Sequence, residues 1–377
     1  MKPREWLASA LAVGTVPALA VLLGLVAGAA VMVISNSLSS GVTDLGLPFR
    51  AYGSLLAGSV SGLDELVRTV SEATPLILVG LSVGIGFKAG LFNIGANGQF
   101  LMGALGAAAT GAAVSGSSPA IAIPAALGAG MLAGAAYGFI PGALKAWTGA
   151  HEVVTTIMLN FIALALIGFL VTGPLSTPGA SFARTGDVGN AALPVIIGRP
   201  DGTGNLGILL AIAAVPLAYL LLFRSVLGFE MRTVGASPSA ALYAGMRPGR
   251  LIVLTMSLCG LLAGTAGAGQ VLGISHSISA SYSTSLGFDA ITIALLGRAH
   301  PVGIFFSALL FGLMRAGSAL MQIRERVPVE IIDVIQAVIL LFLAADIIVR
   351  TIFRIRAQRG AVVDELQTVT RTYGGAA

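Results

Sequence analysis

The chain has 377 residues, of which 56% are hydrophobic and only 10% are charged. A soluble globular protein has about 25% charged residues, so the composition excludes an ordinary soluble domain and indicates a polytopic membrane protein. The net charge of +5 comes from basic residues gathered in a few segments, which bears on membrane topology and does not indicate nucleic-acid binding. One cysteine and three scattered histidines offer no zinc-ligand spacing. We therefore predict no metal site, no cofactor and no catalytic residue.

Apolar runs recur along most of the chain. A helix needs about 20 apolar residues to cross the hydrocarbon core, and the runs that approach this length cover residues 7–34, 71–89, 99–115, 119–147, 152–172, 206–223, 251–273, 287–299, 301–320 and 329–350. The first run is too long for the apolar part of a signal peptide, which favours an uncleaved anchor. The run at 287–299 is short and either spans or re-enters. We predict an all-α membrane protein of about ten transmembrane helices, with broken or re-entrant segments.

Basic residues predict the orientation of these helices, because cytoplasmic loops carry an excess of lysine and arginine. They occur before the first run, between the sixth and seventh runs, and after the last. With ten spans, all three regions fall on the cytoplasmic side, so both termini are expected there. We therefore expect a membrane domain at 1–350, a cytoplasmic loop at 224–250, external loops at 35–70 and 173–205, and a basic cytoplasmic tail at 351–377.

The loop at 224–250 contains the signals of a short helix. Ser237 can cap its N-terminus, Pro238 suits the first helical position, and Gly245 can end it. A plain connector does not need such a helix, whereas a membrane importer driven by a separate motor domain needs an element that seats on the motor. No G-x-x-x-x-G-K-[ST] motif occurs in the sequence, so we predict no P-loop ATP site of its own.

Polar residues interrupt three apolar regions: "GLFNIGANGQ" (90–99), "AHEVVTTIMLN" (150–160) and "SLGFDAITIALLGRAHPVGI" (285–304). Broken helix at membrane depth is tolerated only where it faces protein or a water-filled cavity. Asn93 and Asn97 either meet a neutral polar solute or join helices to one another, and both alternatives remain open. The first two regions supply amides, hydroxyls and one aromatic ring that would suit an uncharged, polyhydroxylated solute. The candidate residues are Phe92, Asn93, Asn97, Gln99, Thr155, Thr156 and Asn160.

Ionisable residues near these regions give weaker signals. His151 and Glu152 open an apolar run and are expected to be an interfacial cap. Asp289 is the acid expected to lie deepest, which by default indicates a functional role, although a pairing with Arg298 across the span would make it structural. Among charged side chains suited to a charged solute, only Lys88 and Arg298 approach membrane depth.

Four segments resemble the permease subunits of bacterial ABC importers: "GLFNIGANGQFLMGALGA" (90–107), "HEVVTTIMLNFIA" (151–163), "GFEMRTVGASPSAALYAGM" (228–246) and "GFDAITIALLGRAHPVGI" (287–304). The resemblance is to the branch that serves simple sugars and nucleosides, which is related to branched-chain amino acid permeases. The forms "NIGANGQ" and "EVVTTIMLN" look closest to nucleoside permeases, while residues 1–70 show no matching segment.

The resemblance implies a subunit of the bacterial cytoplasmic (inner) membrane that is not itself an enzyme. It implies three partners: a cytoplasmic ATPase, a second permease that is identical or related, and an extracytoplasmic solute-binding protein or lipoprotein. On this view 237–246 is the coupling helix and Gly235 its hinge, and Asn93, Asn97 and Gln99 lie near the solute path. The residues expected to couple to the ATPase are Arg232, Gly235, Ser237, Pro238, Tyr243 and Gly245.

Alternatives remain open at this stage. The same architecture importing a ribose- or galactose-type sugar is the first, since sugar permeases carry a similar amide block. An ion-coupled secondary transporter is the second, and it would not need the capped helix of the loop. A membrane enzyme is the third, and the sequence contains no acid–base or metal cluster that would support it.

Overall fold

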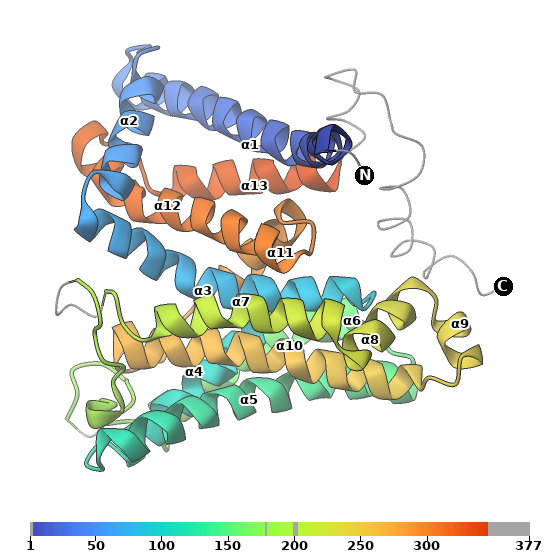
Figure 1. The fold of residues 1–377 in the computed structure, drawn as a ribbon. Helices are drawn as coiled ribbons and strands as arrows, with labels where there is room; N and C mark the ends of the chain where they lie inside the picture. Colours follow the sequence, from blue (N-terminus) through green and yellow to red (C-terminus); the bar gives the residue numbers. More distant parts are fainter. Residues whose placement is uncertain (1–2, 178, 199–202, 346–377) are drawn as a thin grey trace.

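The computed structural model describes residues 3–177, 179–198 and 203–345. The expected basic tail at 351–377 and the end of the last expected span lie outside these residues. The described chain is helical and contains no β-strand beyond two isolated bridges. The elements are α1 (Pro3–Ser40), α2 (Leu47–Val60), α3 (Leu63–Lys88), α4 (Ala96–Ala113), α5 (Pro119–Thr148), α6 (Glu152–Thr172), the 3-10 turn Gly189–Ala191, α7 (Gly207–Arg224), α8 (Val226–Ala236), α9 (Pro238–Tyr243), α10 (Pro248–Gln270), the π turn Val271–Ser275, α11 (Leu286–Leu296), α12 (Pro301–Glu325) and α13 (Glu330–Ala344), as Figure 1 shows.

Each of the expected apolar runs contains a helix. In the described residues, seven helices are long and apolar enough to cross a membrane: Pro17–Leu38, Leu63–Lys88, Pro119–Thr148, Glu152–Thr172, Gly207–Arg224, Pro248–Ser275 and Pro301–Glu325. The expected total of about ten stays a prediction. The all-helical membrane class is confirmed.

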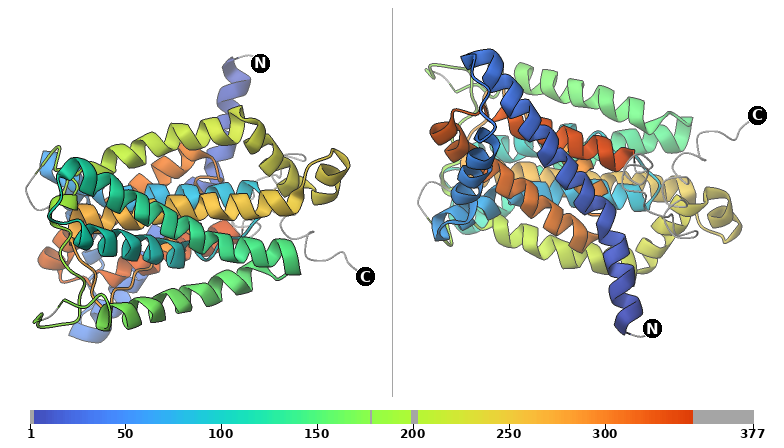
Figure 2. Two further views of the ribbon diagram at one scale, coloured as in Figure 1. Left: turned by 90° about the horizontal axis from the view of Figure 1, so that it is seen from below. Right: turned by 90° about the horizontal axis from the view of Figure 1, so that it is seen from above.

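The helices run roughly alongside one another, and the bundle has two ends that can be named by their elements (Figure 1). At the α9 end, α8 and α9 project beyond the long helices, as both views in Figure 2 show. The start of α1 and the described end of α13 lie towards the same end. At the opposite end, here called the α2 end, lie α2 and most of the segment 173–206.

The segment 35–70 is largely helical, so the expectation of a loop there was wrong, while its external location stays a prediction. The first helix continues to Ser40, α2 occupies Leu47–Val60, and α3 begins at Leu63. The Ser- and Gly-rich composition hid α2, whose buried side is nevertheless spaced as in a helix, at Leu47, Ala51 and Leu55. This side packs on α12, so tertiary contact stabilises a helix too short and polar to be recognised from sequence.

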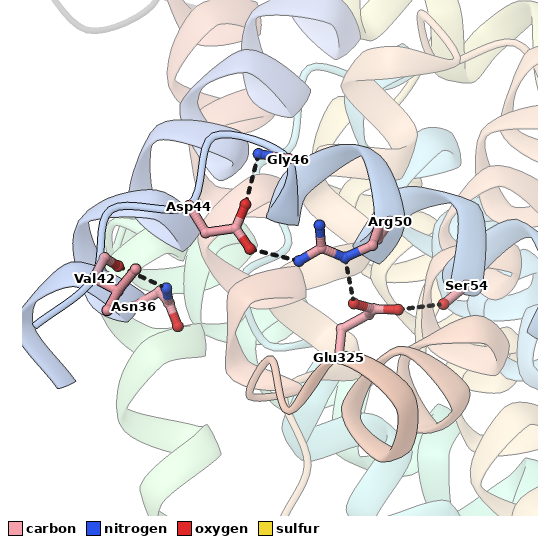
Figure 3. Close-up of polar contacts among 7 residues, drawn as sticks. All are labelled: Asn36, Val42, Asp44, Gly46, Arg50, Ser54 and Glu325. Carbon is pink, nitrogen blue, oxygen red and sulfur yellow. Dashed lines mark hydrogen bonds and ion pairs between the residues drawn. The ribbon is translucent and has the colours of Figure 1, made fainter. Parts of the chain in front are cut away.

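A polar cluster holds the turn between α1 and α2 against the end of α12 (Figure 3). Arg50 lies between two acids: its Nη2 is 2.6 Å from Asp44 Oδ2, and its Nε is 3.2 Å from Glu325 Oε2. Ser54 donates to Glu325 Oε1 over 3.3 Å, and the Gly46 amide donates to Asp44 Oδ1 over 2.8 Å. The Arg50 guanidinium holds the pKa of the exposed Asp44 carboxyl below its usual value.

The most enclosed helix is α3. Every residue from Pro75 to Gly86 is buried, which is the pattern of a helix surrounded by others. It contacts α10 on one side and α11 and α12 on another. On the far side of α11 and α12, α13 pairs with α1, where Gly24 and Gly28 of α1 face Ile335 and Ile339.

The tightest packing joins α4, α5 and α10 through glycines. A Cβ at Gly134 of α5 would lie 2.6 Å from the Gly264 Cα of α10, and a Cβ at Gly264 would lie 2.6 Å from the Gly130 carbonyl oxygen. Gly103 of α4 meets Gly264 in the same way. In a membrane, helices associate through such close backbone approach and not through the hydrophobic effect. The glycine content thus builds one rigid group of three helices.

Gly134→Ala is therefore expected to destabilise the protein by about 1–3 kcal/mol, because an added methyl group has no space between the backbones. The measurement is the thermal midpoint of the purified protein in detergent. Gly128→Ala is the control on the same helix, since a Cβ there meets no atom within 4 Å. Equal midpoints for the two variants would contradict this account of the packing.

Candidate functional site

The chain breaks its helical course between α3 and α4, at residues 89–95. Gly90 has a φ of +68°, a conformation that glycine adopts readily. The Leu91 amide donates to the Gly86 carbonyl over 2.9 Å, which closes the end of α3. The expected interruption is confirmed here, but Asn97 and Gln99 lie in the first turn of α4.

Two buried amides face each other across this break. Asn93 Nδ2 donates to Gln99 Oε1 over 2.8 Å, and Gln99 Nε2 donates to Asn93 Oδ1 over 3.1 Å. Asn93 is 0% exposed and Gln99 is 1% exposed. The pair satisfies one donor and one acceptor of each amide without leaving a charge at membrane depth.

A third amide, Asn160 of α6, holds the break from the other side. Its Oδ1 accepts from the Gly98 amide over 2.7 Å, and its Nδ2 donates to the Ile94 carbonyl over 3.0 Å. These two groups belong to the backbone that the interruption leaves without helical partners, so Asn160 replaces the missing bonds.

The hydroxyls expected beside this amide bond to their own helix. The Thr156 hydroxyl is buried and donates to the Glu152 carbonyl over 2.7 Å, and Thr155, which is half-buried, donates to the same carbonyl over 3.1 Å. Phe92 is half-buried against Phe87, with ring centroids 5.1 Å apart.

A second break precedes α11. After the π turn Val271–Ser275, residues 276–285 run without helix, and their backbone pairs with the segment after α6: the Thr185 amide donates to the Ile278 carbonyl over 2.9 Å. The eleven residues of α11 extend only about 16 Å. Non-helical chain and a short helix together connect the end of α10 to the start of α12, so this stretch is a broken segment.

The two breaks meet. The Gly287 amide at the start of α11 donates to Asn97 Oδ1 over 3.4 Å. A Cβ at Gly287 would lie 2.5 Å from the Asn97 Cβ, so glycine is required for this approach. Asn97, 4% exposed, therefore joins the first turn of α4 to the first turn of α11.

Asp289 pairs with a residue that sequence reasoning missed. Its Oδ2 forms an ion pair with Arg315 Nη2 of α12, and it accepts from Ser285 Oγ over 3.3 Å. The alternative pairing of Asp289 with Arg298 was wrong: Arg298 lies beyond the end of α11, while α12, which carries Arg315, packs alongside α11. The sequence feature that could have indicated this pair is an arginine, Arg315, in the middle of the apolar run "FGLMRAGSAL" (311–320).

Glu152 was expected as an interfacial cap, and this was wrong. The side chain is 1% exposed, and its Oε2 lies 2.6 Å from Lys145 Nζ of α5. The neighbouring His151 precedes α6 as an exposed residue without a capping hydrogen bond from its side chain. Lys145 lies on the preceding helix and reaches the start of α6 because the connection Gly149–His151 is short.

The loop at 224–250 contains the expected short helix, α9. Ser237 Oγ accepts from the Ala240 amide over 3.3 Å, Pro238 is its first residue, and Gly245 follows it with a φ of +82°. Tyr243 is 94% exposed. The loop also contains α8 (Val226–Ala236), which the sequence did not reveal.

Close backbone contact joins α8 to the first break. A Cβ at Gly235 would lie 2.6 Å from the Lys88 carbonyl oxygen and 2.7 Å from the Gly90 nitrogen. Gly235 was expected as a hinge, and it lies in the last turn of α8, against the backbone that leads into Asn93. Arg232 covers the Phe223 ring, with its Cζ 5.2 Å from the centroid.

Comparison with known proteins shows which family this arrangement belongs to. Residues 66–344 match the family described as branched-chain amino acid transport system/permease component. The chain belongs to this family. The permease is 36% identical to the guanosine ABC transporter permease protein NupP of Bacillus subtilis over 92% of its own length and 97% of that relative. The glucose ABC transporter permease protein TsgB13 of Haloferax volcanii is 35% identical, over 91% and 90% of the two chains.

A further relative is the nucleoside ABC transporter permease protein NupB of Lactococcus lactis, which is 33% identical over 89% of this chain and 91% of its own. No solved structure matches the chain. The relatives confirm the resemblance seen in the sequence: this is an ABC-type permease of the nucleoside and sugar branch and a multi-pass inner-membrane protein. Permeases of this kind are transport components and not enzymes themselves.

The expected site residues thus separate into three groups. The first is a buried set at the first break and on α6, in which Asn93 and Gln99 bond each other and the others bond backbone groups: Asn93, Asn97, Gln99, Thr156 and Asn160, with the half-buried Phe92 and Thr155 beside it. The second is Asp289 with Arg315, which is partly exposed. The third, at the α9 end, contains Arg232, Gly235, Ser237, Pro238, Tyr243 and Gly245.

Asn160→Leu is expected to lower the free energy of unfolding by about 1–3 kcal/mol for each of the two backbone groups it leaves unpaired. Thermal unfolding in detergent measures this, and Thr155→Val on the same helix is the control, because the Thr155 hydroxyl bonds only to backbone of α6. Similar losses for both variants would show that Asn160 does not hold the break.

Proposed function

We propose that this permease is the membrane subunit of an ATP-driven importer that passes nucleosides across the cytoplasmic membrane. The observation that carries the proposal is the capped, exposed α9, connected through α8 and the Gly235 contact to the first break. A motor that moves α9 would move the backbone leading to Asn93. A secondary transporter would not need this connection.

The choice of nucleosides rests on the relatives. Proteins named as guanosine and nucleoside permeases match at 36% and 33% identity over most of this chain. A glucose permease matches at 35%, so import of a simple sugar is the second candidate.

The proposed topology has about ten crossings, with both termini and the segment 224–250 in the cytoplasm. Its support is that the start of α1, the described end of α13 and α9 lie towards the same end of the bundle (Figure 1). Arg224, Arg232, Arg247 and Arg250 belong to the segment at this end, which agrees with the positive-inside rule. The segment 173–205 would then be external.

Three partners follow from this proposal: a cytoplasmic ATPase docking on residues 237–246, a solute-binding protein outside, and a second permease. A non-identical second permease has specific support. Two Bacillus subtilis proteins carry the description guanosine ABC transporter permease, and this chain is 36% identical to one and 27% identical to the other.

We also propose that the residues of the first break form a wall of the solute path. Phe92, Asn93, Asn97, Gln99, Thr155, Thr156 and Asn160 would hold the shape of this wall, while Asp289 would face the path. Movement of α8 would reach the wall through Gly90.

Uptake by cells tests the function directly. The permease, its ATPase and its solute-binding protein are expected to accumulate labelled guanosine, and unlabelled ribose or glucose is expected not to compete. An ATPase variant without hydrolysis is the control. Uptake of glucose in place of guanosine would leave the importer class standing and change the solute. Uptake that is indifferent to the ATPase variant would overturn the importer class.

Tyr243→Ala tests the coupling helix. A tyrosine that acts as a hot spot of a docking surface contributes about 2 kcal/mol, so uptake is expected to fall by about tenfold or more while the thermal midpoint stays unchanged. Leu63→Ala is the control, because Leu63 is 81% exposed at the α2 end. An equal effect of both variants on uptake would argue against docking at α9.

A further inference from the structure

The ion pair between Asp289 and Arg315 lies at membrane depth. Arg315 is the fifteenth residue of the 25-residue α12, which places it about 21 Å along a helix about 37 Å long. Asp289 lies in the first turn of α11, where the second break ends. Both charges are therefore far from either end of the bundle.

This pair is partly exposed, unlike the amides of the first break. The Arg315 side chain is 24% exposed and the Asp289 side chain is 13% exposed. Ser285, which accepts from Arg315 Nη2 over 3.4 Å, is exposed, and Phe288 is 52% exposed. Asn93, Asn97, Gln99 and Asn160 are between 0% and 5% exposed.

Charged side chains inside a membrane face the interior of a bundle or a water-filled cavity, because facing lipid is costly. The exposed side of Asp289 and Arg315 therefore cannot be a lipid surface. The adjacent helix α13 adds polar groups: Asp333 is exposed, and its charge acts on Asp289. One turn further, Gln336 is 3% exposed, and neither of its amide atoms has a hydrogen-bond partner among the described residues.

We propose that Ser285, Phe288, Asp289 and Arg315 form a contact site on the solute path that recognises the base of a purine nucleoside. The proposal rests on the proposed function and adds the recognising residues, of which Ser285, Phe288 and Arg315 carried no expected role. The solute contacts these four exposed or partly exposed side chains, whereas the buried amides of the first break form hydrogen bonds within the protein.

The chemistry of the four side chains fits a base better than a sugar. A guanidinium donates two parallel hydrogen bonds to the O6 and N7 edge of a guanine-type base. A carboxylate beside it accepts from ring and exocyclic N–H groups. An exposed aromatic ring next to both offers a surface on which a flat base stacks. The solute is neutral, and the side-by-side charges neutralise each other, so no uncompensated charge is buried when the base binds.

Cysteine accessibility tests the location. Ser285→Cys and Phe288→Cys are made in the permease assembled with its ATPase and solute-binding protein in native membranes, and a charged, membrane-impermeant thiol reagent is applied. Cys259 is 0% exposed and gives no background. Phe161→Cys is the control, because Phe161 is 65% exposed on the apolar α6.

Labelling at 285 and 288, reduced by guanosine, with none at 161, is the expected result. Labelling of 285 and 288 only by a lipid-soluble reagent would overturn the proposal.

Uptake kinetics test the recognition. Arg315→Gln is expected to raise the apparent KM for guanosine about tenfold with a smaller change in maximal rate, and to leave protein abundance near that of the wild type. The double variant Asp289→Arg with Arg315→Asp keeps an ion pair but exchanges the positions of donor and acceptor. Its affinity for guanosine is therefore expected to stay below that of the wild type, as in Arg315→Gln. Lys145→Gln removes the ion pair with Glu152, and is expected to lower abundance with KM unchanged.

Full recovery of guanosine affinity in the exchanged pair would show a purely structural bridge and overturn the proposal. Failure of the proposed function appears separately, in the wild type. If the wild type takes up glucose and not guanosine, this result contradicts both the proposed nucleoside function and the proposed recognition of the base. If the wild type takes up guanosine and Arg315→Gln does so with unchanged KM, this result contradicts only the proposed contact site and leaves the nucleoside function supported.

Discussion

Backbone N–H and C=O groups have no water to bond with inside a membrane, and each one that helix geometry does not satisfy must find a partner in the protein. The permease breaks its helices at residues 89–95 and 276–285. Many of the buried polar contacts in its interior provide hydrogen-bond partners for the backbone at these breaks. Asn160 reaches from α6 to bond Gly98 and Ile94, Asn97 accepts from Gly287, and Thr185 pairs with Ile278. Amides suit this task because one side chain donates and accepts without carrying a charge.

Close packing around the first break provides the rigidity that such bonds need. Gly103, Gly134 and Gly264 let α4, α5 and α10 approach at backbone distance, so the first turns of α4 are held by neighbours that cannot shift without steric overlap. Gly235 brings α8 equally close to Lys88 and Gly90. A displacement of the α8–α9 segment therefore has a direct steric route to the break, without an intervening flexible side chain.

The ion pairs at the starts of α6 and α11 differ from each other in the exposure of their carboxylates. The buried Glu152 pairs with the half-buried Lys145 at the start of α6, where the helix dipole also favours the carboxylate. Asp289 and Arg315 form a pair that stays partly exposed beside an exposed aromatic ring. The two carboxylates differ in exposure, at 1% for Glu152 and 13% for Asp289, and this difference is the basis for the proposal that solute contact lies at α11 and α12.

Much of the architecture is local and was accessible from the sequence. Hydrophobic run length predicts helices because burying a helix in lipid depends on the composition of that segment alone. The caps of α9 lie within its own few residues, at Ser237, Pro238 and Gly245, so they were recognisable too. The same holds for the interruption at Gly90, where a glycine-rich stretch cannot continue a helix, and for the family, whose motifs are short sequence blocks.

Contacts between distant segments were decided only by the tertiary structure. Arg315 and not Arg298 meets Asp289 because α12 lies beside α11, which no spacing in the chain reveals. The helix α2 exists because α12 offers a surface for Leu47, Ala51 and Leu55, and two backbone groups of the first break found a partner because α6 brings Asn160 to them. The sequence by itself determined where helices can form and where they must break, since those are properties of neighbouring residues. Which polar groups are buried as supports and which stay partly exposed depended on packing between segments far apart in the chain, such as Asn97 and Gly287, which are 190 residues apart.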